Sequence, residues 1–284
     1  METGCPSLTA LRVAMRRAAH QILDDPKIFD DPLALRVLGF VDPAPPGQDR
    51  KWLEETPLSR VLRASLAARS RYAEDELCGA IERGVGQYVL LGAGLDTFAY
   101  RNPFPEGVLR VFEVDHPATQ DWKRARLEQA GIQIPDTLTF SPVDFESQTL
   151  EEGLRQAGFD SSRPAFFSWL GVTMYLTNTA VVETLRSIAS MPAGSGVIFD
   201  YLILPSLMNP AERRVFDGLA HRVALAGEPF QTFFDPATLE PMLRDMGFNR
   251  LQDVRPEEMD ARYFGGRTDG LRMGRLAHLM NAQI

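Results

Sequence analysis

One short stretch restricts the fold of this chain more than any other. Residues 88–91 are apolar or aromatic and run directly into Gly92-Ala93-Gly94, with Asp96 two residues further on. Such a run is typical of a buried parallel strand, and glycines at its carboxyl end allow a tight turn and a close approach of backbone to a ligand. A second strand-like run, residues 108–115, ends in Asp115. A glycine turn followed by an acid-ended strand favours a nucleotide-type cofactor whose ribose hydroxyls bind the carboxylate.

After residue 88, strand-like and helix-like segments alternate. We predict strands near residues 88–92, 109–114, 138–142, 165–170, 196–202, 248–254 and 274–282. Helices are predicted between the first five strands, at residues 96–101, 117–130, 147–158 and 178–191. This alternation predicts an α/β fold with a mostly parallel seven-stranded sheet and right-handed crossovers.

Helical segments lie before the sheet and inside its second half. Apolar residues at helical spacing predict helices over residues 8–23 and 52–83. We therefore predict a helical extension or lid over residues 1–84, followed by a cofactor-binding domain over residues 85–284. Within that domain, residues 203–235 are too long for a plain connection, and Asn209-Pro210-Ala211-Glu212 is typical of a helix start. An inserted helix there would cover a ligand at the carboxyl edge of the sheet.

The composition argues against several partners and sites. The 38 acidic and 30 basic residues give a net charge of −8, whereas nucleic-acid binding needs clustered Lys and Arg. Cys5 and Cys78 form no zinc or disulfide pattern, and no group of His and acidic residues suggests a metal site. The first twenty residues lack a signal-type apolar core, and no apolar run reaches the ~20 residues of a membrane span. We expect a soluble cytoplasmic protein without a metal, a nucleic-acid partner or a membrane partner.

The glycine turn departs from the dinucleotide pattern at one position. A nicotinamide-binding fingerprint has the form Gly-x-Gly-x-x-Gly, and Thr97 stands at its third glycine. A phosphate-binding loop ending in Lys-Ser or Lys-Thr is absent as well. A cofactor with an adenosine and an amino-acid tail fits better, with the glycines against the tail and the acid against the ribose. We therefore predict S-adenosyl-L-methionine as the cofactor and disfavour a nicotinamide oxidoreductase.

Several motifs, in order along the chain, resemble those of the leucine carboxyl methyltransferase-like family. They are residues 68–72 (ARSRY), 90–101 (LLGAGLDTFAYR), 112–120 (FEVDHPATQ), 167–177 (FSWLGVTMYLT) and 263–271 (YFGGRTDGL). The last resembles the ending of a bacterial branch of S-adenosylmethionine-dependent methyltransferases. The resemblance runs from about residue 10 to the C-terminus and implies the Rossmann-like fold of class I methyltransferases.

The resemblance also implies which residues contact the three parts of the cofactor. Gly92 and Gly94 would line the methionine end, and Arg69 would bind the carboxylate, for which a guanidinium offers a bidentate contact. Asp144 and Phe145 would contact the adenine: the acid would accept from the exocyclic amine, and the ring would cover one face.

Two carboxylates leave alternatives open. Asp115 is the preferred ribose ligand because charge-assisted hydrogen bonds to two hydroxyls are strong, but Glu113 lies on the same face of the strand. Asp96 either binds the cofactor's ammonium group or caps the next helix. Many family members have a Glu where this chain has Leu170, so part of the family's site is missing or moved.

The reaction implied is methyl transfer from a sulfonium, in which alignment of the two reactants contributes about 7–11 kcal/mol. No general base stands out; Tyr175, Tyr201 and His221 are candidates, and a carboxylate acceptor needs none. We predict a metal-independent O-methyltransferase acting on a carboxylate or hydroxyl of a small molecule. Two alternatives remain: methylation of a protein C-terminal carboxylate, and a cofactor-binding protein without catalysis.

Overall fold

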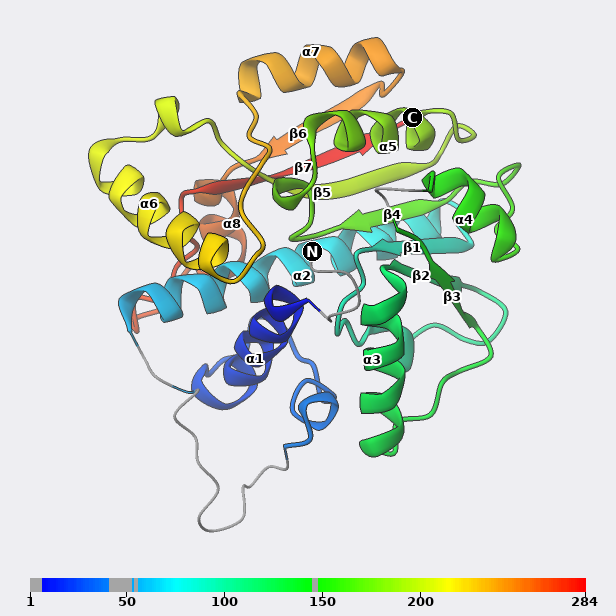
Figure 1. Cartoon of the computed structure of the whole chain (residues 1–284), viewed down its shortest axis with the longest axis horizontal. Coiled ribbons are helices and arrows are strands. Elements are labelled where there is room, and N and C mark those ends of the chain that lie inside the picture. Colours follow the sequence, from blue (N-terminus) through cyan, green and yellow to red (C-terminus); the bar gives the residue numbers. More distant parts are fainter. Residues whose placement is uncertain (1–6, 41–52, 54–55, 145–147) are drawn as a thin grey trace.

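One twisted sheet forms the centre of the molecule (Figure 1). The computed structural model describes residues 7–40, 53, 56–144 and 148–284. Within these ranges the sheet has seven strands in the order β3-β2-β1-β4-β5-β7-β6. The first five strands are parallel where they pair, and β7 is antiparallel to both β5 and β6. The strands are β1 Gln87–Leu91, β2 Arg110–Asp115, β3 Leu138–Pro142, β4 Phe166–Trp169, β5 Gly196–Leu202, β6 Arg250–Val254 and β7 Ala277–Gln283. This architecture confirms the predicted class of fold.

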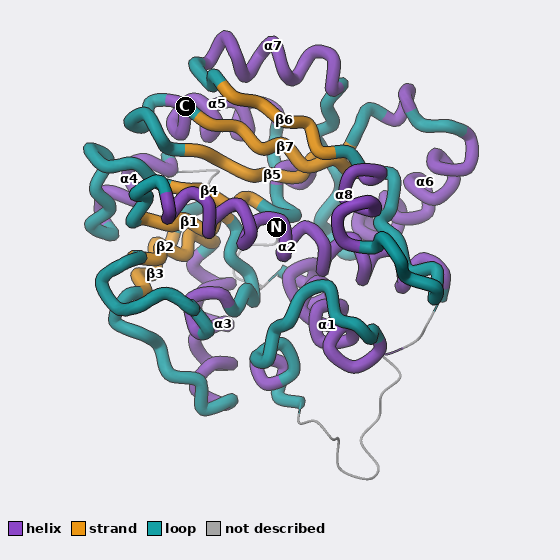
Figure 2. The backbone as a smooth tube through the Cα atoms, turned by 180° about the vertical axis from the view of Figure 1, so that it is seen from behind, coloured by secondary structure: helices purple, strands orange, loops and turns teal. Residues whose placement is uncertain are grey.

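Helices cover both faces of the sheet. Helices α4 (Leu150–Gln156), α5 (Asn178–Ala189) and α7 (Pro236–Met246) pack on one face, and α2 (Pro57–Glu82) and α8 (Pro256–Tyr263) on the other, as Figures 1 and 2 show from opposite sides. Helix α1 (Leu8–Leu23) packs with η1 (Arg36–Leu38) and α3 (Pro117–Gln129) in a smaller apolar cluster. Helix α6 (Pro210–Leu225) follows β5 and the short helix η5 (Pro205–Leu207). Among the helices described, none combines the length and hydrophobicity needed to cross a membrane.

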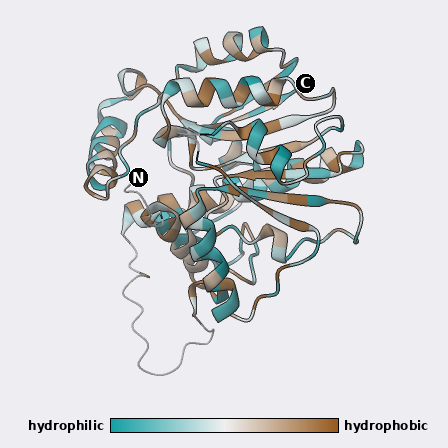
Figure 3. Cartoon of the chain, turned by 45° about the vertical axis from the view of Figure 1, so that its right-hand side comes forward, coloured by the Kyte–Doolittle hydropathy of each residue, from teal (hydrophilic) through white to brown (hydrophobic). Residues whose placement is uncertain are grey.

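The continuous apolar runs of the strands follow from burial on both faces. Along β1, Tyr88 and Leu90 belong to the core under α2, whereas Val89 and Leu91 belong to the core under α4 and α5. Successive strand residues point to opposite faces, so a strand covered on both sides needs an apolar residue at every position. Figure 3 shows the resulting concentration of hydrophobic positions on the strands.

Local capping chemistry sets most helix boundaries. Helix α1 coincides with the predicted residues 8–23, and the Ser7 side chain accepts from Ala10 N at its start. Helix α2 begins later than predicted, at Pro57, because Thr56 caps it and proline suits the first helical position. The Asn209 side chain and Glu212 form a capping box at the start of α6, as their spacing predicted. Helices α7 and α8 lie where we predicted no helix, although each starts with proline.

A buried ion pair joins the second strand to the helix that follows it. Glu113 on β2 and Lys123 on α3 are both almost fully buried, with 2.7 Å between Oε2 and Nζ. Burial raises the pKa of Glu113 to about 7, and Lys123 only partly offsets this effect. The carboxylate therefore depends on Lys123 to remain charged.

We expect Lys123→Met to destabilise the fold by about 3 kcal/mol, because the buried carboxyl of Glu113 loses its partner and must either stay charged alone or take up a proton. The double variant Lys123→Met/Glu113→Gln removes the ionisable carboxyl and should recover most of the loss. Urea denaturation at neutral pH measures both effects. Equal stability of the single and double variants would contradict this account of the pair.

Candidate functional site

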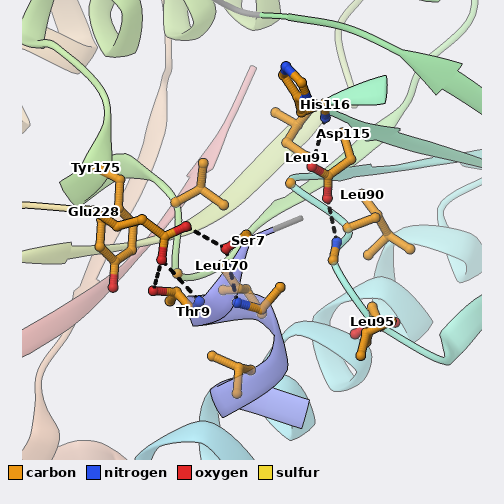
Figure 4. Close-up of a pocket in the computed structure, with 18 of the residues that line it drawn as sticks. Ser7, Thr9, Leu90, Leu91, Leu95, Asp115, His116, Leu170, Tyr175 and Glu228 are labelled. Atoms are coloured by element: carbon orange, nitrogen blue, oxygen red, sulfur yellow. Dashed lines mark hydrogen bonds between the residues drawn. The ribbon is translucent and has the colours of Figure 1, made fainter. Parts of the chain in front are cut away.

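A cavity of about 270 Å³ lies where the glycine turn, β2 and β4 end. Its wall contains the turn after β1, Asp115, the segment after β4, the start of α1, and residues 227–229 and 231 (Figure 4). The carboxyl ends of parallel strands, next to a point where the strand order reverses, are the usual ligand site of such sheets. Here β1 lies between β2 and β4, so the order reverses at the glycine turn.

The turn requires glycine for two reasons. Gly92 and Gly94 have φ angles of +66° and +47°, a region that other residues rarely adopt. A Cβ on Gly92 would also lie only 2.3 Å from Cγ2 of Val172, on the segment after β4. The backbone of the turn therefore packs against the wall of the cavity and leaves no room for a side chain there.

Asp115 and Glu113, the two candidates for the ribose, occupy different environments. Asp115 lines the cavity, and its carboxylate accepts hydrogen bonds from Gly94 N at 2.5 Å and His116 N at 2.7 Å. Burial raises the pKa of Asp115 despite these two bonds. Glu113 instead lies in the core, bound to Lys123. Of the two acids, Asp115 is the one that faces the cavity.

Asp96 contacts both the segment that follows the glycine turn and the N-terminal helix. Its Oδ1 accepts from Phe98 N at 2.7 Å, and its Oδ2 lies 2.6 Å from Nη1 of Arg17 on α1. Burial alone would raise the pKa of Asp96, but Arg17, followed by Arg101, outweighs it and holds the pKa at about 2. Asp96 also lines the cavity. It therefore ties the glycine turn to the N-terminal helix.

Thr97, at the place of the third glycine, has a clear structural use. Its buried hydroxyl donates to Oδ2 of Asp31 at 2.8 Å and accepts from Arg17 and Arg101 at 3.2 and 3.1 Å. A glycine could make none of these bonds. Thr97, which departs from the dinucleotide-binding fingerprint, thus helps to hold α1 against the turn.

Arg69 is held by an acid that the sequence reasoning missed. It lines the cavity from α2, and its Nη1 lies 2.5 Å from Oδ2 of Asp200 on β5. The other oxygen of Asp200 accepts from Gly171 N at 2.5 Å. Gly171 has a φ of +74°, and a Cβ there would lie 2.7 Å from Nη2 of Arg69. The one signal that could have found Asp200 is that it is a lone acid in an otherwise apolar strand.

Leu170, where many family members have a Glu, also lines the cavity. It packs at the edge of the core formed under α2. The carboxylate that contacts Arg69 comes from the neighbouring strand, at Asp200, rather than from position 170.

Of the three candidate bases, only Tyr175 lines the cavity. Burial raises its pKa to about 12, and its ring lies 5.4 Å from the ring of Phe230. Tyr201 is fully buried and donates to Oδ1 of Asp253 at 2.7 Å, away from the cavity. His221 is exposed on α6 and is not part of the cavity wall.

The pair predicted to contact the adenine is only partly described. Asp144 lines the cavity, whereas Phe145 lies outside the described residues. No group of three or more His, Cys, Asp or Glu residues in the described ranges is arranged to hold a metal ion.

A second contact that sequence reasoning missed borders the cavity on the side opposite Asp115 (Figure 4). Glu228 follows α6, and its Oε1 accepts from Ser7 Oγ at 2.7 Å (Figure 4). Its Oε2 accepts from both the backbone N and the hydroxyl of Thr9, with 3.0 Å to the nitrogen. No local pattern relates residues so far apart in sequence, so this contact could be found only in the structure.

The family model described as leucine carboxyl methyltransferase matches residues 10–189. The chain belongs to this family. A Bacillus subtilis protein named "Putative S-adenosyl-L-methionine-dependent methyltransferase" is 32% identical over 97% of both chains. A Mycobacterium avium protein with the same description is 36% identical over 59% of this chain and 56% of its own length. These findings confirm the predicted family, the methyltransferase class and the cofactor.

Solved structures agree on the fold. A "putative methyltransferase" from Thermobifida fusca superposes with a TM-score of 0.58 at 18% identity, over 99% of this chain and 96% of that one. A DUF574 family protein from Streptomyces avermitilis has a TM-score of 0.53 at 17% identity, over 80% of this chain and 84% of that one.

The contact between Asp96 and Arg17 should make stability depend on pH. The folded pKa of Asp96 lies near 2, below the ordinary 3.8, so its contribution is present above about pH 4 and is lost as the pH falls towards 2. The difference in unfolding free energy between wild type and Asp96→Asn should therefore shrink by about 2 kcal/mol between pH 6 and pH 2. Urea denaturation over this range measures it. A constant difference would show that Arg17 does not stabilise the charged form.

Proposed function

We propose that this chain transfers a methyl group from S-adenosyl-L-methionine to a carboxylate or hydroxyl oxygen of a small molecule, without a metal. The observation that carries the proposal is that the glycine turn, Asp115 and Arg69 meet in one cavity at the carboxyl ends of the strands. Glu228 joins the segment after α6 to the start of α1 at the side of the cavity opposite Asp115 (Figure 4). A cavity of about 270 Å³ that is bounded on this side accommodates a small acceptor more readily than the end of a folded protein.

The polar groups of the wall fit the parts of the cofactor. Asp115 would accept hydrogen bonds from the ribose hydroxyls, and the backbone of Gly92 and Gly94 would lie against the methionine end. Arg69 would bind the cofactor's carboxylate, because only Nη1 of its guanidinium is taken up by Asp200 among the described residues. Asp144 would accept from the adenine amine.

When bound, S-adenosylmethionine supplies an activated methyl group that is transferred by in-line displacement. The residues around the acceptor then have to align it and exclude water. The pKa of Tyr175, raised to about 12, keeps its phenol protonated at neutral pH. Tyr175 would therefore donate a hydrogen bond to the acceptor rather than act as a base, which suits a carboxylate that needs no deprotonation.

A protein C-terminal carboxylate is the second candidate acceptor, and the family's description favours it. One experiment separates the two. The protein is incubated with S-adenosylmethionine and either small acids, phenols and alcohols or peptides with free C-termini, and methylated products are identified by mass spectrometry. Methylation of peptides alone would overturn the small-molecule proposal, and no binding of S-adenosylmethionine would overturn the whole function.

Asp115→Ala should weaken S-adenosylmethionine binding by about 2 kcal/mol, which is roughly 30-fold, because hydrogen bonds to a charged group are lost. Asp121→Ala is a matched control, since Asp121 is an exposed acid on α3 outside the cavity wall. Isothermal titration calorimetry measures both affinities. An unchanged affinity in Asp115→Ala would show that another group holds the ribose.

A further inference from the structure

Three arginines lie near the side of the cavity opposite Asp115, where the methyl acceptor would bind. We call this the acceptor side. None of the three has an acidic partner among the described residues. Elsewhere around the site, arginines are paired: Arg17 with Asp31 and Asp96, and Arg69 with Asp200. Arg12 and Arg16 on α1 and Arg222 on α6 make no such contact; the contact recorded for Arg16 is from its Nη1 to the carbonyl of Arg12 at 3.4 Å. Arg12 and Arg222 are exposed, whereas Arg16 is half-buried, so Arg16 is the one of the three whose lack of an acidic partner requires an explanation.

The arrangement is costly for Arg16 in particular. Its side chain is half-buried, and its buried Nε has no hydrogen-bond partner among the described residues. Burial lowers the pKa of its guanidinium, and the nearby charges of Arg12 and Arg222 lower it further. A charge that is partly removed from water and lacks an acidic partner costs free energy, and native proteins retain such groups mainly where they have a function.

The position of Arg16 connects it to the acceptor side. It lies two helical turns after Thr9 on nearly the same side of α1, and Thr9 lines the main cavity. Tyr175, which also lines that cavity, is a near neighbour of Arg16, since its phenolate would raise the pKa of the guanidinium. Arg12 and Arg16 further line a second cavity of about 150 Å³, together with Ser59. Arg63 in the same wall already holds Asp24.

We propose that Arg16, assisted by Arg12 and Arg222, binds an anionic group of the methyl acceptor at a point separate from the oxygen that is methylated. A guanidinium matches a carboxylate or a phosphate through paired N–H donors, and a half-buried guanidinium without an acidic partner is available for that contact. The acceptor is then a small acid with a second anionic group. The identity of the ligand rests on the proposed function. The existence of an anion site at Arg16 does not.

The first test is anion binding by the whole protein. Wild type is titrated calorimetrically with inorganic phosphate and, separately, with malonate, at an ionic strength held constant with sodium chloride. We expect saturable binding of at least one anion, and at least tenfold weaker binding by Arg16→Gln. Tighter binding of phosphate would indicate a phosphate ester as acceptor, and tighter binding of malonate a second carboxylate. Arg214→Gln, which removes an exposed arginine of α6 that makes no ion pair in the described structure, should bind as wild type does.

A second measurement distinguishes a ligand site from a structural role. Arg16→Gln removes a half-buried charge that has no acidic partner in the described structure, so its melting temperature without added anion should not fall. The better-bound anion should raise the melting temperature of wild type and of Arg214→Gln, but not that of Arg16→Gln. No saturable anion binding by wild type, equal binding by Arg16→Gln, or a lower melting temperature of Arg16→Gln without anion would each overturn the proposal.

Titration with S-adenosylmethionine separates this inference from the proposed function. Arg16→Gln should keep the cofactor affinity of wild type, because Arg16 lies outside the wall of the main cavity. A protein that binds phosphate through Arg16 but does not bind S-adenosylmethionine would overturn the function and leave the anion site standing. Binding of S-adenosylmethionine without saturable binding of phosphate or malonate would overturn the anion site and leave the proposed function standing.

Discussion

The contact of Arg17 with the glycine turn holds the cavity together. From one side chain on α1, its guanidinium reaches Asp96, Asp31 and Thr97. Asp96 and Thr97 belong to the turn after β1, and Asp31 belongs to the segment after α1. The other contacts between these two segments come from the small apolar cluster around Leu95. Because all four groups are largely removed from water, the charges need one another. The position of α1, and with it the part of the cavity wall that begins at Thr9, depends on this set of contacts.

A second arginine plays a similar part on the other side of the turn. Arg69 extends from α2 to Asp200 on β5, and Asp200 also holds the backbone of Gly171. The N-terminal helices are thus joined to the sheet through charged side chains at the cavity itself. The helical extension and the sheet therefore build the site jointly, and neither supplies it alone.

The sequence predicted the sheet well because its signals are local. Apolar runs, the glycine turn and the acid at the end of β2 each lie within a few residues, and the strands appear close to the predicted ranges. Because sequence signals are local, they do not reveal contacts between residues that are far apart in the chain. Asp200 and Glu228 act on partners more than a hundred residues away, and no spacing rule connects them. Tyr201 was considered as a base, but strand alternation turns it to the face opposite its neighbour Asp200, where it donates to Asp253.

The contact between Glu228 and the start of α1 limits how substrate preference could be exchanged between related proteins. One carboxylate receives hydrogen bonds from Ser7 and Thr9, so the two segments fit each other as a matched set. Transplanting residues 227–231 alone from a relative would leave the donors of α1 facing a foreign loop, and transplanting α1 alone would do the opposite. A working chimera must carry both segments together, and the pair is the natural unit in which this wall of the site can diversify.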